Sequence, residues 1–138
     1  MIIVDAGFWI ALADKRDKHH EIANNTAKAL DELLITTNPV ITEVCHILLK
    51  RQGIKAQLSF MNMYKLGAFE VFELKKQHRE RIVSLMNQYA DLPMDFADAS
   101  LVLLAEYLEH GRILSTDCRD FHTYHWKNAE PFQNLLFR

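Results

Sequence analysis

Acidic residues at four separate places in the sequence are candidates for metal chemistry. Asp5 directly follows a short apolar run at the N-terminus, and Asp117 closely follows a second apolar run. Glu43 lies in a mostly apolar stretch, and Asp98 lies near the start of a long apolar helical pattern. Carboxylates that converge without matching lysines repel one another unless a cation neutralises them. Because oxygen-only ligand sets select hard ions, the pattern favours Mg²⁺ or Mn²⁺ over Zn²⁺.

Each acid also has a purely structural interpretation, and the residues alone leave both open. Asp5 could cap a helix that follows it. Asp95 and Asp98 have the spacing of a capping box, in which the first residue caps the helix and the second lies at its third position. Asp117 and Asp120 could organise a turn. Glu43 could be an exposed helix residue instead of an inward-facing one.

The elements that must position these acids alternate between strands and helices. Strands are expected at residues 1–4, 34–36, 68–74 and 112–115, with one more edge strand within 121–137. Helices are expected at residues 6–13, 21–33, 39–51, 54–65, 77–89 and 96–109. Asn38 as the cap and Pro39 at the first helical position predict one helix start, and the glycines at 53, 67 and 111 predict three helix ends.

This alternation predicts an α/β fold, a three-layer α/β/α sandwich with a central, mostly parallel sheet. In such folds ligands bind outside the carboxyl ends of the strands. Asp5 and Asp117 each follow a predicted strand, so both are expected at that edge of the sheet.

Composition limits the class of protein. The 138 residues fit a single domain spanning 1–138, and 49% of them are hydrophobic, which is enough for a packed core. No apolar run approaches the length of a membrane span, and the N-terminus lacks the pattern of a secretory signal. Cys45 and Cys118 lie far apart and form no CxxC pair. A reduced, cytoplasmic protein is therefore expected.

The charge pattern argues against a protein that coats nucleic acid by bulk charge, since the net charge is −2. Local basic clusters exist at residues 15–18 and 75–81, and each is either a solvated helix face or an RNA contact. The histidine pairs His19-His20 and His122/His125 lack the spacing of a zinc site. Phe8, Trp9 and Trp126 could stack on bases, although aromatic residues in predicted elements are more often part of a core.

Four segments together resemble the PIN-domain family, in particular the VapC-type toxins of bacterial toxin–antitoxin pairs. They read Ile-Val-Asp-Ala-Gly at 3–7, Val-Ile-Thr-Glu-Val at 40–44, Asp-Phe-Ala-Asp-Ala-Ser-Leu at 95–101, and Ile-Leu-Ser-Thr-Asp-Cys-Arg-Asp-Phe at 113–121. Their order and spacing fit across nearly the whole chain. The polar loop at residues 14–20 also looks like the loop that follows the first helix in many relatives.

The resemblance assigns roles to individual residues. The family's catalytic and metal-binding acids match Asp5, Glu43, Asp98 and Asp117. The family's common serine or threonine two residues before the last acid matches Ser115, and Asp95 and Asp120 are plausible extra acids. Within the 95–101 segment, the resemblance makes Asp98 the metal ligand and leaves Asp95 as the helix cap.

The resemblance implies a metal-dependent endoribonuclease, the toxin of a toxin–antitoxin pair, with Mg²⁺ or Mn²⁺ as cofactor. Whether one or two ions bind stays open. The implied partners are RNA, a small antitoxin whose chain lies across the acidic pocket and offers a basic residue, and a second copy in a homodimer. Apolar side chains on the helix at 54–66 could serve either protein contact or pack in the core. The alternative function is a PIN-fold RNA-processing component or a non-catalytic RNA- or protein-binding module.

Overall fold

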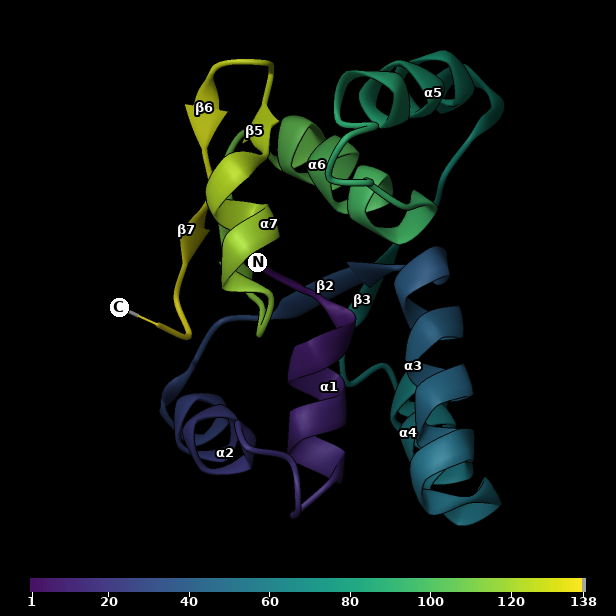
Figure 1. The fold of residues 1–138 in the computed structure, drawn as a ribbon. Helices are drawn as coiled ribbons and strands as arrows, with labels where there is room; N and C mark the ends of the chain where they lie inside the picture. Colours follow the sequence, from purple (N-terminus) through teal and green to yellow (C-terminus); the bar gives the residue numbers. More distant parts are fainter. Residues whose placement is uncertain (138) are drawn as a thin grey trace.

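The computed structural model describes residues 1–137, and Figure 1 shows its fold. A five-stranded sheet forms the centre in the order β3-β2-β1-β4-β7, and every neighbouring pair runs parallel. Its strands are β1 (Ile2–Val4), β2 (Leu34–Thr37), β3 (Glu70–Phe72), β4 (Arg112–Leu114) and β7 (Gln133–Asn134). A separate antiparallel hairpin consists of β5 (His125–Trp126) and β6 (Glu130–Pro131).

Helices cover both faces of the sheet, which confirms the predicted three-layer α/β/α class. In Figure 1, α1 to α4 lie below the strands and α5 and α6 lie above them. The helices are α1 (Ala6–Ala13), α2 (His20–Ala29), α3 (Asn38–Gln52), α4 (Ile54–Leu66), α5 (Arg79–Gln88), α6 (Phe96–Leu108) and α7 (Cys118–Thr123), and a 3₁₀ turn, η1 (Lys76–His78), precedes α5. No helix within residues 1–137 is long and apolar enough to cross a membrane.

The central strand and α6 form the middle of the core. All three residues of β1 are buried, as expected for a strand covered on both faces. Helix α6 packs against β1 and β2 and is buried along most of its length. Two buried threonines of β2 make bonds here. Thr36 Oγ1 donates to the Val4 carbonyl at 2.8 Å and joins β2 to β1, and the hydroxyls of Thr37 and Ser100 lie 2.6 Å apart and join β2 to α6. These bonds satisfy polar groups that burial would otherwise penalise.

Phe8 and Trp9 belong to the core, so the suggestion that they stack on bases is wrong. Their exposed fractions are 0% and 3%. The Trp9 ring packs against Phe60 of α4 and against Phe69, which precedes β3, with ring centres 5.7 and 4.8 Å apart. This cluster joins α1 to α4.

The second helix is shorter than predicted, because sheet pairing overrides the helical pattern at its end. It stops at Ala29 instead of residue 33, and Leu30 is already extended. The Leu33 carbonyl accepts a hydrogen bond from the backbone N–H of Ile2 at 2.8 Å. The chain leaves the helix at Leu30, and this brings Leu33 beside β1, where the sheet begins.

Other boundaries differ for local reasons. Thr37, with φ −127°, is the cap of α3, so Asn38 is the first helical residue and the predicted Asn38 cap is wrong. Helix α6 ends at Leu108, because Glu109 adopts the left-handed conformation, with φ 59°, that was expected of Gly111. The C-terminal stretch contains the predicted edge strand, β7, together with α7 and the β5–β6 hairpin, which were not predicted.

Candidate active site

The acids meet where the strands of the parallel sheet end. Asp5 directly follows β1 and is the cap of α1, and Asp117 follows β4 and is the cap of α7. Asp95 is the cap of α6. Helix α3 begins directly after β2 and carries Glu43 in its second turn. The edge predicted from the strand pattern is therefore surrounded by the first turns of four helices.

Asp5 is held by both of its carboxylate oxygens. Oδ1 accepts from the backbone N–H of Ala6 at 2.7 Å, and Oδ2 accepts from the Ser115 hydroxyl at 2.9 Å. Ser115 Oγ in turn accepts from the backbone N–H of Asp117 at 3.0 Å. Ser115 thus ties the end of β1 to the end of β4, which is a physical reason for a hydroxyl residue at this position.

Burial destabilises the negative charge of Asp5. Its exposed fraction is 8%. Desolvation raises the pKa of the Asp5 carboxyl from 3.8 to about 6, against the two hydrogen bonds that lower it, and the charges of Asp117 and Asp95 raise it further.

Asp95 and Asp98 form a reciprocal capping box, as their spacing predicted. Asp95 Oδ1 accepts from the backbone N–H of Asp98 at 2.8 Å, and Asp98 Oδ2 accepts from the backbone N–H of Asp95 at 3.3 Å. The Tyr124 hydroxyl also donates to Asp98 Oδ2 at 3.2 Å. Desolvation, followed by the charges of Asp95 and Asp5, raises the pKa of Asp98 to about 8.

Glu43 faces the same region from α3 and is half-buried. Desolvation raises the pKa of Glu43 from 4.5 to about 7, and the charges of Asp5, Asp95 and Asp117 add to the shift. The alternative of a simple exposed helix residue is therefore wrong for Glu43, because its charge interacts with three other acids.

Asp117 and Asp120 stand side by side at the start of α7. Asp117 Oδ1 accepts from the backbone N–H of Asp120 at 3.2 Å. Asp120 Oδ1 is buried and has no hydrogen-bond partner within the described residues, while the nearest cation, Arg119 Nε, lies 3.8 Å away. Desolvation and the adjacent Asp117 raise the pKa of the Asp120 carboxyl above its usual range.

One cavity of about 450 Å³ brings all these acids together. Its lining includes every acid that the sequence singled out: Asp5, Glu43, Asp95, Asp98, Asp117 and Asp120. Ser115 lies behind the cavity through its bond to Asp5 and does not line it. The catalytic and metal-binding roles of these residues stay predictions.

Three residues of this region were not predicted as part of the site. Asp17 and Arg51 line the cavity and pair at 3.5 Å, so the loop after α1 and the end of α3 form one wall. The family-like appearance of the loop at 14–20 was a signal for Asp17. Tyr124 gave no signal, because the bond that links it to Asp98 spans 26 residues of sequence.

Comparison with known proteins shows the family to which the chain belongs. A family model described as "PIN domain" matches residues 2–125. The chain belongs to the PIN-domain family. It is 24% identical over 120 residues to Ribonuclease VapC26 of Mycobacterium tuberculosis, covering 87% of this chain and 89% of the relative.

Two solved structures share the fold. One is Mycobacterium tuberculosis VapC20, described as a Sarcin-Ricin loop cleaving toxin, with a TM-score of 0.80, 19% identity, and coverage of 86% of this chain and 92% of that chain. The other is a toxin–antitoxin complex from Klebsiella pneumoniae, with a TM-score of 0.65, 18% identity, and coverage of 89% of this chain and 92% of that chain. The predicted resemblance to VapC-type PIN domains is confirmed.

The PIN-domain cavity has the chemistry of a site for a hard divalent ion. Among residues 1–137, seven acidic residues and one arginine line it, and that arginine pairs with Asp17. The raised pKa values and the unpartnered Asp120 oxygen show negative charge that the described side chains do not compensate. No three candidate ligands within residues 1–137 stand close enough to form a ready-made cluster. The carboxylates therefore stand too far apart to enclose an ion by themselves, and this spacing fits Mg²⁺, which keeps several of its own waters, better than an ion that needs a complete protein cage.

Proposed function

We propose that this PIN-domain protein is a metal-dependent endoribonuclease and the toxin of a toxin–antitoxin pair. The observation that carries the proposal is the acidic cavity at the carboxyl end of the parallel sheet. The ribonuclease name of the curated relative and the toxin descriptions of the solved ones support it. Asp5, Glu43, Asp98 and Asp117 would hold Mg²⁺ or Mn²⁺, with Asp95 and Asp120 as accessory acids.

Hydrogen-bond donors of the protein hold the carboxylates in position. Ser115 and the Ala6 N–H fix Asp5, and the Asp95 N–H and the Tyr124 hydroxyl fix Asp98. A divalent ion held by these carboxylates would lower the pKa of an attacking water and would stabilise the leaving oxygen of a phosphodiester. Without a cation these carboxylates would repel a phosphate, so RNA and metal are expected to bind together.

The test is cleavage of RNA by the purified protein. RNase activity is expected in Mg²⁺ or Mn²⁺, with loss in excess EDTA and return when the metal is restored. Asp5→Asn is expected to remove most of the activity, while Asp31→Asn, which changes an exposed aspartate far from the cavity, keeps it. Activity that persists in EDTA, or in both variants, contradicts the proposal. A well-folded protein that binds RNA without cutting it would favour the non-catalytic alternative.

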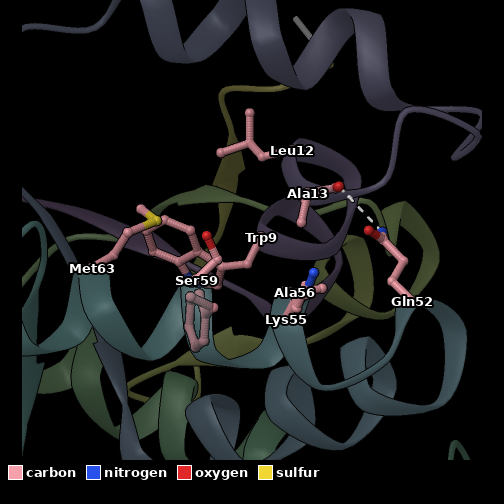
Figure 2. A pocket seen from close by; sticks show the side chains of 9 residues that line it. Trp9, Leu12, Ala13, Gln52, Lys55, Ala56, Ser59 and Met63 are labelled. Atoms are coloured by element: carbon pink, nitrogen blue, oxygen red, sulfur yellow. Dashed lines mark hydrogen bonds between the residues drawn. The ribbon is translucent and has the colours of Figure 1, made fainter.

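An antitoxin has a suitable surface beside the acidic cavity. A groove of about 440 Å³ lies between α1 and α4, and its lining includes Trp9, Leu12, Phe60 and Met63. Figure 2 shows Trp9, Leu12 and Met63 in this groove. Trp9 Nε1 is buried and has no hydrogen-bond partner within the described residues. Helix α1 borders both hollows, since Ile10 lines the acidic cavity. A chain seated in the groove could therefore extend a basic residue towards the carboxylates.

A charged residue introduced into this groove tests whether the antitoxin binds there. Ser59 lies in the groove and is exposed, and Ser84 is an exposed serine on α5. Ser59→Glu is expected to prevent co-purification with the product of the neighbouring reading frame, and Ser84→Glu is the matched control. Undiminished binding by Ser59→Glu would show that the antitoxin does not use the groove, and a lower mass of Ser59→Glu in light scattering would then indicate that the groove is a homodimer contact.

A further inference from the structure

A second hollow adjoins the acidic cavity and has a different character. It encloses about 690 Å³ between the first turns of α3 and α6 and the segment after β3. Glu43 and Asp95 line both hollows, so the two lie next to each other. The second hollow is lined mainly by apolar surface, including Pro39, Leu74 and Phe96.

Phe96 is the most unusual side chain in this hollow. It is 49% exposed, whereas the next turns of α6 are largely buried. Phe96 lines this hollow together with Glu43 and Asp95, which also line the acidic cavity, so the ring lies in the hollow next to the carboxylates. No ring–ring contact involves Phe96 within the described residues. The ring is therefore free on one side to meet a flat ligand.

Polar and cationic groups complete the surroundings. Asn38 and His46 line the hollow and are exposed, which offers an amide and an imidazole for the edge of a base. Leu74 is followed directly by Lys75 and Lys76, both exposed. A strand that leaves the carboxylates and crosses the ring would bring its next phosphate towards these two lysines.

We propose that the hollow at Phe96 is a nucleobase subsite, in which the base next to the scissile phosphate of single-stranded RNA stacks on the Phe96 ring. This subsite rests on the proposed ribonuclease function, because that function places a phosphodiester at the adjoining carboxylates. Aromatic side chains that bind successive bases, with cations that follow the backbone, are the usual means of holding single strands. A second copy of this chain fits less well, since it would close the side of Glu43 and Asp95 that a substrate must reach.

The experiment compares binding of two RNA probes. One is a fluorescein-labelled single-stranded RNA of mixed sequence, and the other is the same strand with abasic positions. Anisotropy is measured with Mg²⁺ in an Asp5→Asn background, in which the strand is expected to stay uncut. Phe96→Leu removes the ring, Phe96→Tyr keeps it, and Tyr107→Leu changes an exposed aromatic at the far end of α6.

Stacking of a base on Phe96 predicts a specific pattern of binding affinities. Phe96→Leu is expected to weaken binding of the intact strand roughly 5- to 150-fold, the equivalent of about 1–3 kcal/mol for one stacked base. Its affinity for the abasic strand is expected to match that of the parent protein. Phe96→Tyr and Tyr107→Leu are expected to bind both strands as the parent does.

Other outcomes separate the subsite from the proposed function. Unchanged binding by Phe96→Leu, or equal weakening for both probes, overturns the subsite even if the unmutated protein cleaves RNA. A protein that never cleaves RNA but shows the Phe96-dependent pattern keeps the subsite and loses the nuclease. If Phe96→Leu alters only the oligomeric state in light scattering, the hollow is a contact between copies and the subsite is wrong.

Discussion

Replacing Asp5 with asparagine should stabilise the metal-free protein about twice as much at pH 8 as at pH 5, and should change it little below pH 3.8. The folded protein raises the pKa of the Asp5 carboxyl from 3.8 to about 6, mainly by desolvation. Well below pH 3.8 the carboxyl is protonated in both the folded and the unfolded state, so it does not change the free energy of unfolding. As the pH rises through this window, the unfolded chain releases its proton first, so the folded state loses stability until the carboxyl has ionised in both.

The size of the effect follows from the shift. Each pKa unit corresponds to about 1.4 kcal/mol, so a shift from 3.8 to about 6 gives roughly 3 kcal/mol at pH 8. Only 8% of Asp5 is exposed, which leaves little solvent screening to reduce that value. Asparagine keeps an oxygen for the Ala6 N–H and can donate to Ser115, so the cap survives. For a chain of this size the gain corresponds to a rise in Tm on the order of 10 °C.

Thermal unfolding at pH 5 and pH 8, in EDTA and in Mg²⁺, measures this difference. Mg²⁺ is expected to raise the Tm of the unmutated protein at pH 8 and to have much less effect on Asp5→Asn, because binding stabilises only the form that binds. Asp31→Asn is the control with an exposed carboxylate. A lower Tm for Asp5→Asn in EDTA at both pH values would refute the reasoning, since it would show that the charge itself holds the fold together.

Three further predictions concern the same cavity. Asp98→Asn should give a folded, nearly inactive protein, whereas Asp95→Asn should keep substantial activity because asparagine caps a helix almost as well as aspartate. Cleavage rates and melting temperatures of the two variants test this difference, and the reverse result would show that the metal ligand was assigned one helical turn away from its true position. Tyr124→Phe removes the donor to Asp98 Oδ2 and should weaken Mn²⁺ binding, measured by calorimetry, with little loss of Tm. Gly7→Ala places a Cβ against the Thr116 hydroxyl and should cost about 1–3 kcal/mol in urea unfolding.

Local signals in the sequence were sufficient to predict the helices and strands that surround the site. The apolar run at the N-terminus became β1, and the Pro39 and Gly53 signals bounded α3 to within one residue. Gly67 ends α4 in the left-handed conformation, with φ 72°, as a helix-ending glycine is expected to do. These features depend on neighbouring residues, which is why a single sequence reveals them.

Features that depend on distant partners were not predictable in the same way. The helix expected to reach residue 33 ends at Ala29, and the extended segment that follows brings Leu33 beside Ile2, a partner that only the assembled sheet supplies. The Tyr124–Asp98 bond and the Arg51–Asp17 pair likewise join residues from different elements. The positions of the acids after strands and at helix starts could be read locally, but the groups that hold them could not.

The two interpretations of the acids, as helix caps and as metal ligands, turn out to be compatible. Asp5, Asp95 and Asp117 each accept a backbone N–H of the helix they begin, and all three line the acidic cavity. A capping bond uses one carboxylate oxygen and fixes its direction, while the second oxygen stays available to another partner. The positive ends of the helix dipoles also offset part of the repulsion between the acids. The caps therefore hold like charges together before any cation binds, and Asp→Asn substitutions, which keep a cap and remove a charge, separate folding from catalysis at these positions.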